Sequence, residues 1–333
     1  MIRVARFSLV ALLVAYAATV VATGAVAMWH REPLGWPLVW QVLAVNPVEF
    51  DSWPYYAFAL ATLAAEPAIV GWRKSSLRRL MVDPSASATT DTFYCAINAS
   101  GLLTVLIAVA GFGLGMWLDV VLSDNIGAVI GIDWPIWLAL PGGFAVITFA
   151  DYLQHRIQHS RLMWPLHKSH HSSTEFTVLS AFRVHPFDQL FQGLMSSASL
   201  ALIGFTLETV LVLQIVFYFT NIFTHSNLTC LAALQRFGVV TPAGHRLHHS
   251  SEPRYHNCNF SGAWNVWDRL FGTYVAPPAD IDQVAIGVEA PAGRHNTANP
   301  FREIALQTID WLHILRIEAR ALTARRAPAK APA

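Results

Sequence analysis

The chain has 333 residues, of which 54% are hydrophobic and 13% are charged. Soluble domains carry charges on about a quarter of their residues, so this composition argues against a soluble enzyme and favours a membrane protein. The formal net charge of +1 gives no sign of a strongly charged partner, and we expect no nucleic-acid ligand.

Hydrophobic runs follow one another along the chain, and each is close to or above the about 20 residues that a helix needs to cross a bilayer. They lie at residues 7–28, 53–72, 94–121, 134–153 and 191–223. The last run is long enough for a hairpin or a pair of helices. The sequence therefore predicts an all-α integral membrane bundle with about four or more transmembrane helices.

The first run has two interpretations. Basic residues, an apolar stretch and the small triplet Ala25-Val26-Ala27 are typical of a cleaved signal peptide. However, the apolar stretch is longer than the ~7–15 residues of a usual signal core, which favours an uncleaved anchor.

Basic residues indicate which side of the membrane the runs face. Arg3 and Arg6 precede the first run, residues 73–79 (RKSSLRR) follow the second, and residues 155–168 (HRIQHSRLMWPLHK) follow the fourth. Alternating crossings put these basic clusters on one face, which the positive-inside rule assigns to the cytoplasm. We expect a multi-pass protein with a cytoplasmic helical cap, in the plasma (inner) membrane if the source is bacterial.

The distribution of histidines and charges divides the chain into three parts. We expect a membrane-anchoring region at residues 1–130, a histidine-rich domain at 131–277 and a cytoplasmic tail at 278–333. Apolar residues after Asn299 recur at helical intervals, which predicts an amphipathic helix in the tail. Two placements stay open for this helix, on the membrane surface or against the protein's own cap.

Short histidine motifs stand out in the middle of the chain. The motif HRIQH places two histidines four residues apart, so that both rings leave one face of a helix. HKSHH and HRLHH each place one histidine three and four residues before an adjacent pair, and on a helix such a triplet can serve two metal ions. The three boxes comprise His155, His159, His167, His170, His171, His245, His248 and His249.

This clustering indicates a metal centre. With 14 histidines in 333 residues, chance would give roughly a few hundredths of an HxxHH match, and the chain has two. Imidazole suits iron, copper, zinc and nickel, and four ligands already fill a zinc site, so eight clustered rings predict a dinuclear centre. The lack of HExxH weighs against a zinc protease. Three widely spaced cysteines (Cys95, Cys230 and Cys258) weigh against a thiolate site.

Four further side chains are candidates for the same centre. His225 ends the 191–223 run and would reach the boxes if that run turns back, so we expect a ninth ligand there. Asp151 precedes the first box by one helical turn, where it would accept the second N–H of a ligating ring or serve only as a membrane-boundary charge. His185 and His256 are candidates for an extra ligand, a hydrogen-bonding partner of a ligand or a substrate gate. The isolated rings His30, His295 and His313 are expected to be structural.

The order and spacing of these motifs resemble the fatty acid hydroxylase/sterol desaturase superfamily of integral membrane di-iron oxygenases. The resemblance covers residues 134–275 and rests on HRIQH, HKSHH, RVHP, THSN, HRLHH and the closing NVWDRLFGTY. It implies that the eight box histidines and His225 hold two non-haem iron ions at the cytoplasmic edge of the bundle. It also implies that residues 131–277 form the catalytic domain.

The same resemblance implies an oxidoreductase that uses O2 and external electrons to hydroxylate or desaturate a C–H position of a sterol, fatty acyl chain or related lipid. The sequence shows no cytochrome b5-like domain or nucleotide-binding fingerprint, so we expect a separate electron donor, a ferredoxin or a cytochrome with its reductase.

Two other functions stay open from the residues alone. A histidine-rich membrane metal transporter or sensor would place its rings along a route through the membrane, whereas the boxes lie beyond the ends of the apolar runs. A bis-histidine haem cytochrome would need well-separated rings on paired helices, and HxxHH does not supply that arrangement.

Overall fold

The computed structural model describes residues 53–82, 84–103, 107, 135–201, 207–288 and 296–326. The predicted run at 7–28, most of the run at 94–121, His30 and His295 lie outside these residues. Within the described ranges the chain forms α-helices, 3-10 helices and isolated β-bridges, with no strand. The all-α prediction is therefore confirmed for this part of the chain.

The α-helices, in chain order, are α3 (Trp53–Val70), α4 (Ser76–Met81), α5 (Ala86–Ala99), α8 (Ile136–Gln158), α9 (Trp164–His171), α10 (Pro186–Ala201), α11 (Leu207–Thr224), α12 (Pro242–His248), α13 (Val266–Leu270) and α14 (Pro300–Arg326). The 3-10 helices are η1 (Trp72–Lys74), η2 (Val178–Phe182), η3 (Thr229–Phe237), η4 (Pro253–Tyr255) and η5 (Ile281–Gln283).

Three of the predicted membrane runs contain helices. Run 53–72 contains α3, run 134–153 contains most of α8, and run 191–223 contains most of α10 and α11, so the last run holds a helix pair. Of the helices in the described ranges, none has both the length and the apolar character required to cross a bilayer.

Local signals in the sequence explain where the box-bearing helices begin. Helix α9 carries Pro165 in its first turn, and α12 begins with Pro242 after Thr241, whose side chain accepts the N–H of Gly244. Proline suits these positions because the first turn has no internal acceptor for its N–H. Gly244 also allows η3 to approach, since a Cβ there would lie 1.5 Å from Nε2 of Gln235.

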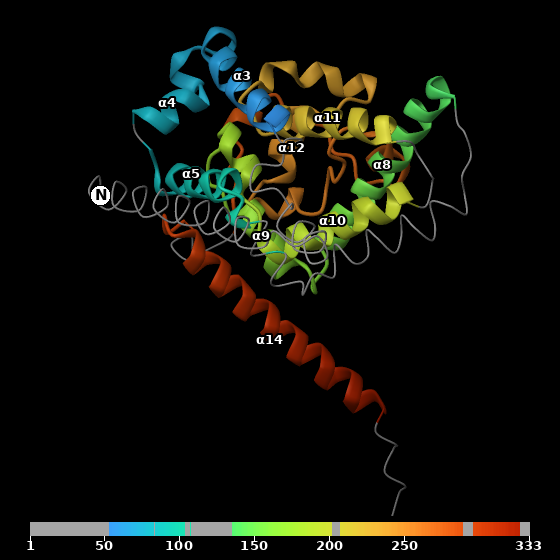
Figure 1. Cartoon of the computed structure of the whole chain (residues 1–333). Coiled ribbons are helices and arrows are strands. Elements are labelled where there is room, and N and C mark those ends of the chain that lie inside the picture. The colour runs from blue at the N-terminus through green and yellow to red at the C-terminus, as the bar shows by residue number, and fades with distance from the viewer. Residues whose placement is uncertain are drawn as a thin grey trace, which may run out of the picture.

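The helices pack into one body around the histidine-bearing segments. Helix α8 packs against α10 and α11, and α11 also contacts α3 and α12. The first part of α14 packs on α9 and α5, and the rest of α14 extends away from the other helices (Figure 1). A helix is thus present after Asn299, and its first turns pack on α9 and α5.

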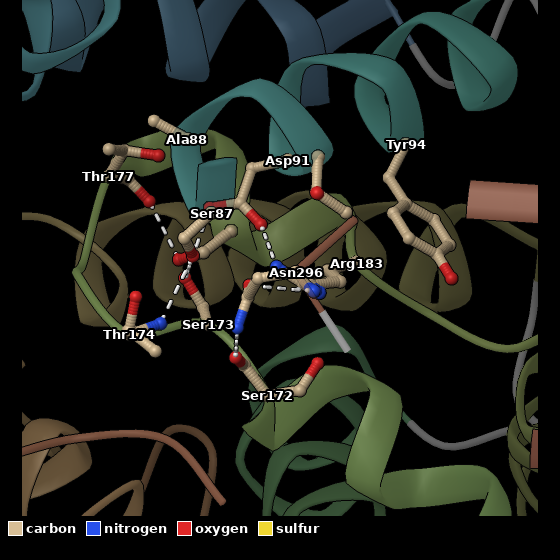
Figure 2. A network of polar contacts seen from close by, with 12 residues as sticks. Ser87, Ala88, Asp91, Tyr94, Ser172, Ser173, Thr174, Thr177, Arg183 and Asn296 are labelled. Atoms are coloured by element: carbon tan, nitrogen blue, oxygen red, sulfur yellow. Dashed lines mark hydrogen bonds and ion pairs between the residues drawn. The ribbon is translucent and has the colours of Figure 1, made fainter. Parts of the chain in front are cut away.

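A buried ionic network joins α5, the segment after α9 and the start of α14. The guanidinium of Arg183 donates to Asp91 at 2.9 Å, to Glu303 at 3.0 Å and to Asn296 at 3.1 Å, and none of the three charged side chains is exposed. Figure 2 shows Asn296 reaching from Arg183 to the carbonyl oxygen of Ser172, the residue that follows the second histidine box. The network therefore fixes the end of α9 against two other helices.

Candidate metal centre

The nine histidines predicted as ligands lie together in two groups. The five-histidine group comprises His155, His159, His167, His171 and His248, and the four-histidine group comprises His170, His225, His245 and His249. In each group, the candidate ligand nitrogens all lie within 4.8 Å of one another. The groups adjoin, because the rings of His171 and His249 stack with their centroids 4.2 Å apart.

Helix geometry divides each HxxHH box between the two groups. In α9, His167 and His171 belong to the five-histidine group and His170 to the other. At the end of α12, His248 belongs to the five-histidine group, while the residue after it belongs to the four-histidine group with His245. Successive residues on an α-helix point about 100° apart, so an adjacent pair necessarily faces two directions.

Hydrogen bonds to backbone carbonyls set the tautomers of three rings. The Nδ1 of His155 lies 2.6 Å from the carbonyl oxygen of Phe260, and the Nδ1 of His248 lies 2.6 Å from that of Cys258. The Nδ1 of His225 lies 2.8 Å from the carbonyl oxygen of Asn221, one turn earlier in α11. A carbonyl can only accept, so each Nδ1 carries the proton and each Nε2 keeps a lone pair for a ligand.

A fourth ring is oriented by a carboxylate. The Nδ1 of His167 lies 2.9 Å from Asp188, which is fully buried in the first turn of α10 and also accepts the Nε2–H of Gln158 at 2.7 Å. Sequence reasoning missed Asp188. The one signal in the sequence is its position at the start of a helix, three residues after His185. Nothing in the spacing links Asp188 to His167, which lies 21 residues earlier.

The remaining ring nitrogens converge on one another. The Nε2 atoms of His159 and His248 each lie 3.1 Å from Nε2 of His171, and those of His225 and His249 each lie 3.1 Å from Nε2 of His245. The Nε2 atoms of His155 and His167 are buried without a hydrogen-bond partner. Two imidazole nitrogens bound to one ion at about 2.0–2.1 Å are separated by about 3 Å, so the spacing fits shared metal ligands.

Burial keeps these rings neutral, as metal ligands must be. It lowers the pKa of His225 to about 4 and that of His248 to about 3. Burial, reinforced by the neighbouring imidazoles, also holds the pKa values of six further rings well below the usual value: His155, His159, His170, His171, His245 and His249. Several neutral imidazole nitrogens that gather within 4.8 Å of one another suit a metal ion, so both groups fit one.

The closing NVWDRLFGTY segment holds the backbone that orients two of these rings. Asp268 is buried and accepts the N–H of Phe260 at 2.8 Å, the N–H of Ser261 at 3.0 Å and the hydroxyl of Thr273 at 2.7 Å. Asn259 adopts a left-handed φ of 52° in the same loop. This loop therefore presents the carbonyl oxygens of residues 258 and 260 to His248 and His155.

Three of the predicted residues lie elsewhere. Asp151 does not accept a hydrogen bond from His155, because the backbone of the 258–262 loop occupies that role, and its carboxylate instead accepts the N–H of Gly262 at 2.9 Å. His185 is buried against α14, with Nε2 3.1 Å from the hydroxyl of Thr308. His256 is exposed after η4. None of the three belongs to either histidine group.

A cavity of about 680 Å3 opens onto both histidine groups. His155 and His167 of the five-histidine group line it together with His170, His225 and His245 of the four-histidine group. Its other walls come from α8, α10, α11 and neighbouring segments. A substrate of moderate size would therefore lie directly beside both groups.

Comparisons with known proteins match this part of the chain. The fatty acid hydroxylase family model matches residues 140–273. The chain is 32% identical over 147 residues to the ornithine lipid hydroxylase OlsE of Rhizobium tropici, a match that covers 44% of each protein. It is 28% identical over 170 residues to alkylglycerol monooxygenase of Xenopus tropicalis, covering 51% of this chain and 35% of that one.

A third relative, the Delta(7)-sterol 5(6)-desaturase of Eremothecium gossypii, is 30% identical over 166 residues, covering 46% of this chain and 43% of the relative. The chain thus spans less than half the length of each of these three relatives. No solved structure matches the chain significantly. The family model and these relatives place residues 140–273, which carry all three histidine boxes, in the fatty acid hydroxylase/sterol desaturase superfamily.

Proposed function

We propose that this protein is an O2-dependent oxidoreductase that hydroxylates or desaturates a C–H position of a lipid at a dinuclear non-haem iron centre. The observation that carries the proposal is the pair of adjoining histidine groups that open onto one cavity. The relatives support a lipid substrate, because they are named for ornithine lipids, alkylglycerols and sterols. Both hydroxylases and a desaturase occur among them, so both reaction types stay open.

The five-histidine group would hold one iron and the four-histidine group the other. Bound iron supplies the activation of O2 and the oxidising power that attack on an unactivated C–H bond needs, which no side chain offers. The protein's part is orientation: the carbonyl oxygens of residues 258 and 260 and the carboxylate of Asp188 fix three rings. Burial of the rings keeps bulk water from the reacting centre.

Metal analysis tests the proposal directly. Detergent-purified, iron-enriched protein should contain two irons per chain, and Mössbauer spectroscopy should show a coupled non-haem pair. A haem spectrum, or one exchangeable zinc with no iron uptake, would overturn the assignment. Tight packing of the rings already disfavours haem, since the ring centroids of His171 and His249 lie 4.2 Å apart and those of His155 and His248 lie 4.4 Å apart, which leaves no room for a porphyrin between them.

Electrons would come from a separate protein, a ferredoxin or a cytochrome with its reductase. The purified chain should therefore oxidise lipid with NAD(P)H only after such a partner is added. Turnover with NAD(P)H and O2 alone would show that the chain takes electrons from the nucleotide itself.

We further propose that the chain is a multi-pass membrane protein with the histidine groups on the cytoplasmic side. The hydrophobic composition and the basic clusters beside the predicted runs support this topology. Cys230 is exposed on η3, near the third histidine box, and provides a site for a topology probe. A membrane-impermeant maleimide should label Cys230 in inside-out vesicles and not in intact cells, with Cys230→Ser as the control. Labelling in intact cells would reverse the orientation.

A further inference from the structure

The cavity beside the histidine groups has a mixed lining of apolar side chains, hydroxyl groups and amides. Its polar part includes the carboxyl group of Asp151 and the amide groups of Asn98, Gln154, Gln158, Gln189, Gln192 and Asn221. Among the lining residues, all of them in the described part of the chain, there is neither lysine nor arginine. A slot built only for an alkyl chain would not need this lining, because each buried polar group must find a partner.

Several amide groups of the lining donate a hydrogen bond within the protein. Gln158 and Gln192 donate to Asp188 at 2.7 Å and 3.4 Å. Asn221 donates to the hydroxyl of Tyr55 at 2.7 Å. These bonds fix the orientation of the three amide groups, and their carbonyl oxygens remain as acceptors.

One acceptor in the lining has no partner. The Oε1 atom of Gln189 is buried and forms no hydrogen bond within the described structure. An unpaired buried acceptor is unfavourable, so a group bound in the cavity gains free energy by donating to it.

Asp151 supplies a carboxyl group at the same cavity. One carboxylate oxygen accepts the N–H of Gly262 at 2.9 Å. The contact is close, because a Cβ at position 262 would lie 2.8 Å from that oxygen and would displace the carboxyl group. No lysine or arginine of the lining pairs with Asp151, so a bound group that donates to its carboxyl oxygens would stabilise the ionised form.

We propose that this cavity binds the polar head group of a lipid through hydrogen-bond donors, an ammonium or a hydroxyl group, that reach Asp151 and Gln189. The proposal rests on the proposed function and makes it more specific. Because His167, His170 and His225 line the same cavity, the oxidised carbon lies near the head group and not at the far end of an alkyl chain.

Binding of three amphiphiles tests the need for donors. A primary amine, the corresponding alcohol and its methyl ether, all with one alkyl chain and a radiolabel, are equilibrated with the iron-loaded full-length protein in nanodiscs, and empty nanodiscs correct for partition. We expect the amine or the alcohol to bind about tenfold more tightly than the ether, which accepts but cannot donate. Equal binding of all three would overturn the proposal.

Two substitutions locate the acceptors and distinguish the two donors. Asp151→Asn removes the charge but keeps an oxygen for the N–H of Gly262, and Gln189→Leu removes the unpaired oxygen. Each should weaken donor-bearing amphiphiles about tenfold and leave the ether unchanged. If Asp151→Asn weakens binding of the amine alone, the natural head group carries an ammonium group. If it weakens binding of the amine and the alcohol to a similar degree, the head group carries a hydroxyl group.

The matched control is Asp282→Asn, which alters an exposed carboxylate paired with Lys74 outside the cavity. It should leave all three affinities unchanged. Unaltered binding in both Asp151→Asn and Gln189→Leu would contradict the proposal. Donor-dependent binding without any lipid oxidation would refute the proposed oxygenase function alone, whereas oxidation of lipids with donor-independent binding would refute only the head-group proposal.

Discussion

At the scale of single residues, adjacent histidines that belong to different histidine groups provide a test of the metal centre. His248 and His249 are adjacent in the chain and belong to different groups. Replacing either with Ala removes one ligand, so we expect fewer than two irons per chain and at least about a 100-fold loss of lipid oxidation. His313→Ala changes an exposed ring on α14 outside both groups and should preserve both quantities. Full iron content and activity in His248→Ala would refute its role as a ligand.

The buried rings also predict how the metal-free protein responds to pH. An unfolded histidine has a pKa near 6.5, whereas the folded pKa is about 4 at His225 and about 3 at His248 because of burial. Below pH 6.5 the unfolded chain therefore binds more protons, and each ring costs about 1.4 kcal/mol of stability per pH unit until its folded pKa is reached. The thermal unfolding midpoint of the metal-free protein should therefore decrease as the pH is lowered from 7 to 5. A midpoint independent of pH in this range would mean that the rings are hydrated.

At the scale of elements, the loop before α13 orients histidines on two helices, His155 on α8 and His248 on α12. Asp268→Asn replaces one accepting oxygen with an NH2 group, which cannot accept the N–H of Phe260 or Ser261. We expect the carbonyl groups that orient His155 and His248 to shift, and iron affinity to fall about 10- to 100-fold. Competition with a chelator measures the affinity, and far-UV circular dichroism should be unchanged. Asp280→Asn, at an exposed site, is the control.

At the scale of the whole molecule, the Arg183 network joins three segments that are distant in sequence. Arg183→Met leaves Asp91 and Glu303 buried without their cation, and removing one partner of such a group costs about 3–5 kcal/mol. We expect a clear fall in the thermal midpoint in detergent. Arg254→Met, which breaks an exposed ion pair with Glu252, should have no measurable effect. Equal midpoints for the two variants would show that the network adds nothing to stability.

Local sequence patterns predict the helices and which histidines can lie together. The 3.6-residue period of a helix decides that His155 and His159 share a face and that an adjacent pair such as His170 and His171 diverges, so spacing alone indicated a two-part site. The tail helix was predicted for the same reason, from apolar residues at helical intervals after Asn299. These features depend on residues within about one turn of each other.

Tertiary structure alone decided what orients and surrounds the rings. The acceptor for His155 is a backbone carbonyl 105 residues away, and a carbonyl has no signature in a sequence because every residue carries one. Asp188 orients His167, and Asp151 faces the cavity instead of a ring, because the packing of α8 against α10 and the 258–262 loop sets these distances. The sequence by itself thus determined which residues gather, and only the folded chain determined which atoms meet.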